Sequence, residues 1–164
     1  MEKIIIAAVS KNNVIGDKGK LPWHNKEELR HFRNTTTGFP VIMGRKTWEA
    51  VAHPLDNRLN IILTRNPEFS FAHPNVIVCR SIQEALSECS KRKFDKVFFI
   101  GGAEIFEQTI NLADGIILSR MNFETEGDKF FAAFDLAEWI LERTEAFTEF
   151  KVDYYISRQK NEII

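Results

Sequence analysis

Short, continuous runs of apolar residues recur through the first two thirds of the chain, and segments with helical periodicity separate them. The runs cover residues 4–9, 41–43, 60–63, 76–78 and 97–100. A strand that is apolar at nearly every position has both of its faces buried. Strands of this kind alternating with helices are typical of a largely parallel sheet that helices cover on both sides. The alternation therefore predicts an α/β fold.

Helical periodicity between the runs predicts helices over residues 26–35, 45–52, 82–92 and 104–111. The third of these begins with Ser81 and Glu84, which have the spacing of a capping box. After Gly115 the pattern changes to strands over 116–121, 139–147 and 154–158, which predicts an antiparallel addition at one sheet edge. For 164 residues without a repeated segment, we expect one domain over residues 1–164.

Composition limits the functions that such a chain can serve. A net charge of -1 argues against binding to nucleic acid or an anionic membrane, because both usually need an excess of basic residues. No apolar stretch suits a secretory signal or the roughly 20 residues of a membrane span, so we expect a cytoplasmic protein with a small partner. Cys79 and Cys89 lack the spacing of a disulfide framework or zinc site, and the 4 histidines form no close pair. We therefore expect free thiols and no metal.

The first predicted helix carries a carboxylate on its apolar side. Residues four apart share a helix face, so Glu28 lies beside Phe32 and is expected to point toward the core. Burying a carboxylate without a partner is costly or forces it to take up a proton, so such an acid is usually kept for a ligand. A helix start shifted by one or two residues would instead turn Glu28 toward solvent, and this alternative stays open.

Two turns that contain glycine follow predicted strands where a helix begins, which is where α/β folds bind ligands. The first turn, from Gly44 to Thr47, offers two cations, a hydroxyl and the free N–H groups of a helix start, which together suit an anion. The second turn, Gly101-Gly102, lets the backbone approach a ligand closely. Neither turn has the spacing of a P-loop or of a Rossmann fingerprint, and each could equally be a helix cap.

Further cations follow these turns. Arg58 comes after a turn-rich segment, and Arg65 stands just past the strand that ends in Leu63-Thr64. Arginines are common on protein surfaces, so neither is informative alone. An inward acid, two glycine turns and separated cations together indicate a site for an extended ligand with negative charge at two ends.

The ordered set of these features resembles the dihydrofolate reductase family from end to end. The resemblance is carried by Ile6-Ala7-Ala8, Val14-Ile15-Gly16, Leu21-Pro22-Trp23, Glu28-Leu29, Phe32, residues 40–49, Pro54-Leu55, Arg58, residues 60–63, Ile100-Gly101-Gly102 and Gly127-Asp128. It implies a central, mostly parallel eight-stranded sheet with an antiparallel C-terminal edge and four flanking helices. It also implies reduction of 7,8-dihydrofolate to tetrahydrofolate by NADPH, in support of one-carbon metabolism and thymidylate synthesis.

By this resemblance, Glu28 orients and polarises the pterin by accepting hydrogen bonds from its amino group and an adjacent ring nitrogen. Hydride passes to C6 of the pterin, N5 gains a proton through water, and Leu21 and Trp23 join the catalytic set. Arg58 pairs with the α-carboxylate of the glutamate tail. The other residues expected to bind the substrate are Ile6, Ala7, Leu29, Phe32, Val51, Leu55, Ile100, Phe106 and Ser119.

The resemblance also implies a binding site for NADPH. Its nicotinamide end would contact Ala8, Ile15 and Gly16, and its pyrophosphate Lys46, Thr47 and the Gly101-Gly102 turn. Its 2′-phosphate would contact Arg45, Thr64 and Arg65, cations that favour NADPH over NADH. The remaining members of the expected cofactor site are Gly44, Leu63, Ile100, Ala103, Glu104 and Ile105.

Residues 16–21 match the mobile lid of the family, and Trp23 would stand at its hinge. Antifolate inhibitors are expected partners, and the chain is expected to be a monomer. Some positions depart from the family pattern. The differing residues are Phe106 in place of a frequent tyrosine, Ser119 in place of a threonine that supports the acid, and Lys129 and Ala132 after Gly127-Asp128.

Two other functions stay open at the level of sequence. A reductase of riboflavin biosynthesis has a similar fold and uses NADPH, but its pocket would not need Trp23, Glu28 and Arg58. A silent NADPH- or folate-binding protein would keep the pocket and lack hydride transfer.

Overall fold

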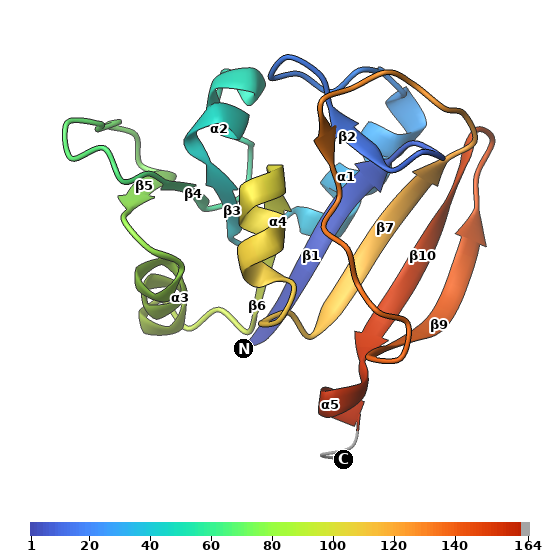
Figure 1. Cartoon of the computed structure of the whole chain (residues 1–164). Helices are drawn as coiled ribbons and strands as arrows, with labels where there is room; N and C mark the ends of the chain where they lie inside the picture. The colour runs from blue at the N-terminus through green and yellow to red at the C-terminus, as the bar shows by residue number, and fades with distance from the viewer. Residues whose placement is uncertain (162–164) are drawn as a thin grey trace.

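The computed structural model describes residues 1–161, and their strands are short and mostly apolar. The strands are β1 (Glu2–Val9), β2 (Val14–Gly16), β3 (Val41–Gly44), β4 (Asn60–Leu63), β5 (Val76–Cys79), β6 (Lys96–Gly101), β7 (Gly115–Met121), β8 (Lys129–Phe130), β9 (Trp139–Ala146) and β10 (Phe150–Ser157). Eight of them form one sheet in the order β5-β4-β3-β6-β1-β7-β10-β9. Neighbours from β5 to β7 pair in parallel, whereas β10 is antiparallel to both β7 and β9. The predicted α/β sheet with an antiparallel C-terminal edge is confirmed (Figure 1).

The four predicted helices are present, with their ends shifted by at most two residues. The helices within residues 1–161 are α1 (Lys26–Thr36), α2 (Arg45–Val51), α3 (Ile82–Lys91), α4 (Ala103–Thr109) and the short α5 (Arg158–Asn161). The helix α5 was not predicted, because the sequence suggested that the last strand continued through residue 158. The predicted Ser81 cap is confirmed, because its hydroxyl accepts a hydrogen bond from the Glu84 N–H at 3.0 Å. The Glu84 carboxylate reaches back to the N–H of Arg80 at 2.7 Å instead of that of Ser81, so the box is closed one residue earlier than its spacing predicts.

The helices cover both faces of the sheet, as continuous apolar strands require. On one face, Ala85 and Cys89 of α3 and Phe106 of α4 pack on Phe99 of β6 in one buried cluster. On the other face, Trp48 of α2 joins a second cluster, and Phe32 of α1 packs against it. Figure 1 shows α4 in front of the sheet and α1 behind it. No helix within residues 1–161 is both long and apolar enough to cross a membrane.

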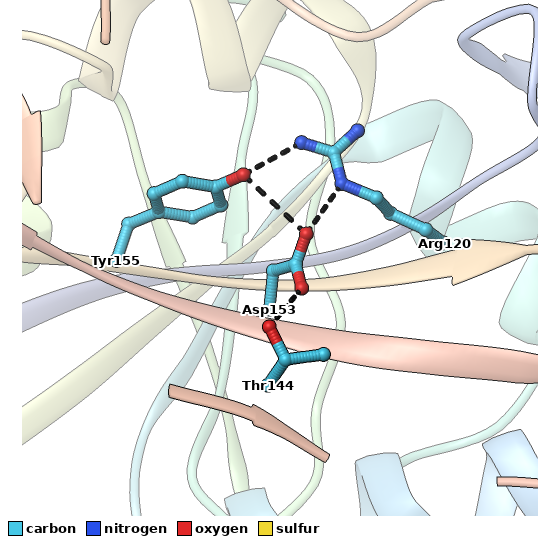
Figure 2. Close-up of polar contacts among 4 residues, drawn as sticks. All are labelled: Arg120, Thr144, Asp153 and Tyr155. Atoms are coloured by element: carbon cyan, nitrogen blue, oxygen red, sulfur yellow. Dashed lines mark hydrogen bonds and ion pairs between the residues drawn. The ribbon is translucent and has the colours of Figure 1, made fainter. Parts of the chain in front are cut away.

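The predicted start of the last strand at residue 154 is wrong, because β10 begins at Phe150. The sequence misled because Asp153 is buried in this strand, where an apolar residue would be expected. Figure 2 shows how Asp153 is satisfied: it accepts hydrogen bonds from Thr144 at 2.8 Å and from Arg120 Nε at 2.7 Å. Burial alone would raise the pKa of Asp153, but the contacts with Thr144 and Arg120 hold it below its usual value. The buried negative charge of Asp153 in the antiparallel edge is therefore balanced by Arg120.

Candidate functional site

A cleft of about 1330 Å³ opens at the carboxyl ends of the parallel strands. Its walls include Ala8 at the end of β1, Gly44 at the end of β3, Leu63 at the end of β4 and Ile100 near the end of β6. Pockets for one ligand usually measure roughly 300–1000 Å³, so this cleft has room for two ligands placed end to end or face to face.

The cleft brings together most of the residues singled out from the sequence. Those that line it are Leu21, Glu28, Ile6, Ala7, Leu29, Phe32, Val51, Leu55, Arg58, Ile100, Phe106, Ala8, Ile15, Gly16, Gly44, Arg45, Lys46, Thr47, Leu63, Thr64, Arg65, Gly102, Ala103, Glu104 and Ile105. Trp23, Gly101 and Ser119 are not among its lining residues. Side chains from distant parts of the sequence therefore share one site.

Glu28 is the buried acid of this cleft. It lies in the first turn of α1, where its N–H donates to the side-chain oxygen of the capping residue Asn25 at 2.9 Å. This cap fixes the start of the helix, and the Glu28 residue is only 6% exposed, so the predicted inward direction is confirmed. Burial raises the pKa of the Glu28 carboxyl, and the Ser119 hydroxyl lowers it to a smaller extent. Over residues 1–161, the carboxylate has no ion pair or hydrogen-bond donor of good geometry.

Of the three predicted site residues that do not line the cleft, Trp23 and Ser119 each carry a buried polar group. Ser119 Oγ and Trp23 Nε1 have no hydrogen-bond partner among the described residues. The Trp23 ring packs edge-on against Phe123, with ring centroids 5.5 Å apart. Buried polar groups of this kind are usually satisfied by ordered water or by a ligand. Of the two, Ser119 lies beside the buried acid, so a ligand or water that binds Glu28 would be within reach of its hydroxyl as well.

Arg58 lies at the other end of the apolar part of the cleft and is 7% exposed. Its Nε donates to the Asp56 carbonyl oxygen at 2.9 Å, and its Nη1 donates to the Thr36 hydroxyl at 3.0 Å. Burial lowers the pKa of Arg58, and the positive charge of Arg33 lowers it further, but an arginine remains protonated near neutral pH. The cation is thus held in place by neutral groups and can bind a carboxylate. Arg33 also lines the cleft and was not predicted, although it shares a helix face with Leu29.

The two glycine turns approach each other across the cleft. The Gly101-Gly102 peptide bond is cis, and the Phe106 ring covers Gly101. A Cβ atom at Gly102 would lie 3.5 Å from Thr47 Oγ1, and one at Gly44 would lie 3.9 Å from the Gly101 carbonyl oxygen. The Ile105 side chain, with Cγ1 3.5 Å from the Cβ position of Gly44, and the Thr47 hydroxyl border the turns, and the lack of a side chain at Gly44 and Gly102 themselves lets a ligand approach their backbone closely.

Cations line the cleft where β3, β4 and β5 end, toward the opposite edge of the parallel sheet from β7, whose Ser119 lies beside Glu28. Arg45 forms an ion pair with Glu49 one helical turn away, and Arg65 Nη2 lies 3.9 Å from Glu104 Oε1. Arg80 also lines this end and was not predicted. Its position directly after β5 is a signal that sequence analysis could have used, because the carboxyl ends of parallel strands share one edge.

Comparison with known proteins identifies this arrangement. The family model described as dihydrofolate reductase matches residues 3–160. The dihydrofolate reductase of Haemophilus influenzae is 42% identical over 86% of this chain and 85% of its own length, and that of Bacillus subtilis is 36% identical over 88% and 83%. A solved dihydrofolate reductase from Enterococcus faecalis, complexed with NADP(H) and RAB-propyl, superposes with a TM-score of 0.85, at 30% identity and 96% coverage of both chains. The chain belongs to the dihydrofolate reductase family.

The predicted family, enzyme class and cofactor are thereby confirmed: the chain is an oxidoreductase that uses NADPH to reduce dihydrofolate. The residues that depart from the pattern of dihydrofolate reductases occupy ordinary structural positions. Phe106 packs against Phe131, with ring centroids 5.2 Å apart, so its ring keeps an apolar role without a hydroxyl. Ala132 is buried, and Lys129 forms part of β8, which pairs with β2 beside the cleft. The joint after Asp128 thus retains strand pairing.

Residues 16–21, which the resemblance predicts to be a lid, begin at the short ribbon of β2 and β8. The sequence did not reveal this ribbon, because its strands have only three and two residues. After β2, Asp17 and Lys20 exchange two backbone hydrogen bonds of 2.8 and 3.0 Å around a tight turn. The Lys18 N–H donates to both Asp128 oxygens at 3.3 Å. Beside it, a Cβ atom at Gly127 would lie 2.2 Å from Val14 Cγ1, so only glycine allows this close approach. Gly127 and Asp128 therefore hold the base of the segment in place.

Proposed function

We propose that this cleft transfers a hydride from NADPH to C6 of 7,8-dihydrofolate, while N5 gains a proton and NADP⁺ is released. The observation that carries the proposal is the buried Glu28 carboxylate, which has no ion-pair partner within residues 1–161 and only the Ser119 hydroxyl beside it, and which shares one cleft with the two glycine turns and their cations. Acid and turns lie at different places in the sequence, but the carboxyl edge of the sheet brings them together. A charged group buried without a partner suits a ligand that supplies hydrogen-bond donors.

Glu28 binds the amino group and the neighbouring ring nitrogen of the pterin. Both groups are donors, and a carboxylate accepts two of them side by side. The raised pKa of Glu28 reflects its apolar surroundings, in which a hydrogen bond to a bound ligand is stronger than in water. Ser119 is a positioning residue on this account, since its buried hydroxyl lies beside the acid.

The proton for N5 arrives through water, because Glu28 holds the opposite edge of the pterin. The unpartnered Trp23 Nε1 supports this route, since a buried indole N–H can hold a water molecule. Leu21 lines the cleft nearby and helps to exclude bulk water from the reacting atoms. The residues of the short turn after β2 close over this region as a lid.

The p-aminobenzoyl glutamate part of the substrate follows the apolar side of the cleft to Arg58, which binds the α-carboxylate. Arg58 is suited to this role because neutral groups already hold its guanidinium. The side chains that would contact the folate are Ile6, Ala7, Leu29, Phe32, Val51, Leu55, Ile100 and Phe106. Antifolates that carry the same donor groups would compete for these contacts.

When bound, NADPH supplies the hydride that reduces C6. The exposed backbone of the two glycine turns, bordered by the Thr47 hydroxyl, fits its pyrophosphate, and the cations beyond it fit the 2′-phosphate. Ala8, Ile15 and Gly16 would hold the nicotinamide end. Gly44, Lys46, Thr47, Gly101, Gly102, Ala103 and Ile105 would surround the pyrophosphate, and Arg45, Leu63, Thr64, Arg65 and Glu104 would surround the adenosine end.

We further propose that residues 1–164 form one domain that works as a monomer in the cytoplasm and binds neither nucleic acid nor membranes. Cys79 and Cys89 are buried free thiols, as expected, and a reducing compartment suits them. Light scattering after size-exclusion chromatography would test the oligomeric state.

The test is to mix the purified protein with NADPH and to follow the loss of its absorbance after adding dihydrofolate. We expect rapid oxidation of NADPH, slower oxidation of NADH, and a loss of roughly 10²–10⁴-fold in turnover for Glu28→Gln. Glu27→Gln is the matched control, because Glu27 contacts Thr148 outside the cleft. Binding of both ligands without oxidation would instead indicate a silent binder, and unchanged turnover in Glu28→Gln would contradict the role of the acid.

A further inference from the structure

An acid of the cleft lies where the proposed function requires positive charge. Glu104 in the first turn of α4 and Arg65 after β4 both line the cleft, and their Oε1 and Nη2 atoms are 3.9 Å apart. Gln108 Nε2 donates to the same Glu104 oxygen at 3.4 Å. The carboxylate is thus held toward Arg65 from its own helix, and it joins two elements that approach the cleft from different parts of the chain.

The three arginines at this end differ in their partners. Arg45 and Arg65 each face a carboxylate, from Glu49 and Glu104 respectively. Arg80 faces none among the described residues, and its guanidinium instead donates to the carbonyl oxygens of Thr64, Asn66 and Phe69 at 3.4, 2.6 and 3.2 Å. Its bonds hold the loop that carries Arg65 in place without neutralising any charge.

We propose that Glu104 is a specificity-determining residue that weakens the binding of the 2′-phosphate and so limits the preference for NADPH over NADH. This inference rests on the proposed function, which places the 2′-phosphate beside Arg65. In the free protein, Glu104 competes for Arg65, and in the complex its negative charge repels the dianionic phosphate. NADH carries a hydroxyl in place of this phosphate, so Glu104 disfavours NADH less.

The exposure of the two side chains sets how strongly Glu104 changes the affinity for NADPH. The side chains of Arg65 and Glu104 are 87% and 76% exposed, so water and salt screen their interaction. Exposed pairs of this kind are worth little, and removing the acid should tighten NADPH binding roughly two- to fivefold. Reversing the charge should have a larger effect, because attraction then replaces repulsion.

The experiment measures the Kd values of NADPH and NADH by quenching of tryptophan fluorescence for the wild type, Glu104→Gln, Glu104→Lys and Glu107→Gln. Glu107 is the matched control, because it is an exposed acid of α4 that does not line the cleft formed by the described residues. We expect the ratio of the NADH Kd to the NADPH Kd to rise roughly two- to fivefold in Glu104→Gln and further in Glu104→Lys. We expect it to stay constant in Glu107→Gln, and the gain to shrink as ionic strength rises from about 0.01 to 0.15 M.

An unchanged ratio in Glu104→Gln would overturn the inference and leave the proposed function intact. A lower ratio would also overturn it, because Glu104 would then position Arg65 for the phosphate. An equal rise in Glu107→Gln would show that only the overall charge matters, which contradicts a local role. A wild-type protein that binds NADPH no better than NADH would contradict the proposed 2′-phosphate site itself, and the inference with it.

Discussion

Replacing Glu28 by glutamine should make the free protein more stable while it makes the enzyme almost inactive. The residue is 6% exposed, and its carboxylate has no donor of good geometry among the described residues. A buried polar group without a partner costs about 1–3 kcal/mol, and more when charged. Glutamine has nearly the same shape and no charge but keeps a buried amide, so we expect a gain of about 1–2 kcal/mol at pH 8.

The gain should depend on pH. In the unfolded chain the glutamic acid loses its proton near pH 4.3. Burial raises the pKa of Glu28 in the folded protein, so the folded state binds the proton more tightly than the unfolded state. The wild type therefore loses stability as the pH rises through the interval between these two pKa values, whereas Glu28→Gln does not. At about pH 4 and below, where both states of the wild type are mostly protonated, the advantage of the variant should be small.

Urea unfolding of both proteins without ligands, at about pH 4 and pH 8, measures this difference. A gain of about 1 kcal/mol corresponds to a rise in Tm of about 2–4 °C for a chain of this size. Glu27→Gln is again the control and should change stability by less than about 0.5 kcal/mol, because Glu27 lies on the other side of α1 and contacts Thr148. The reasoning is refuted if Glu28→Gln is less stable than the wild type at pH 8, or if its gain is the same at both pH values.

Three further substitutions test other parts of the structure. Asp153→Asn should lower the free energy of unfolding by about 1–3 kcal/mol at neutral pH, because it breaks the pair with Arg120. Since the pKa of Asp153 lies below its usual value, this difference should fade in urea unfolding below about pH 4, as the wild-type carboxyl takes up its proton. Gly127→Ala should destabilise the protein and slow turnover, since its Cβ would lie 2.2 Å from Val14 Cγ1, and unaltered values of both would contradict the clash. Arg58→Gln should raise the KM for dihydrofolate at least tenfold, with little change in the KM for NADPH, and steady-state kinetics would expose an error if both rose together.

Most of the parallel sheet could be predicted because strands buried on both faces are apolar at nearly every position. Both ends of each strand from β3 to β6 were predicted to within one residue, and the Ser81 cap marked the start of α3. The ribbon of β2 and β8 was missed because two or three residues carry no periodicity. The start of β10 was missed because Asp153 interrupts the apolar pattern, and only its partners on neighbouring strands explain its burial.

For the site, helix phase was enough to turn Glu28 inward, because Asn25 caps the helix at the predicted position. The residues of the folate and cofactor sites came from the family resemblance, and the fold places most of them in one cleft. The sequence could not show which charged side chains contact each other. Arg65 and Glu104 lie far apart in the chain, and their contact depends on the placement of α4 beside the end of β4.

Glu28 and Asp153 show how a structural acid differs from one kept for a ligand. Both are acids of about 5% exposure, since Glu28 is 6% and Asp153 is 4% exposed. Asp153 is surrounded by Thr144, Arg120 and Tyr155, as Figure 2 shows, and its pKa is lowered. Glu28 has only the Ser119 hydroxyl beside it and no cation paired with it among the described residues, and burial raises its pKa. The two acids are equally buried, but their pKa values shift in opposite directions. Asp153 therefore stabilises the fold, whereas the free-energy cost of burying Glu28 is offset only when a ligand binds. On this criterion, a pterin that donates to Glu28 should lower the pKa of its carboxyl, because hydrogen bonds to the ionised form favour it.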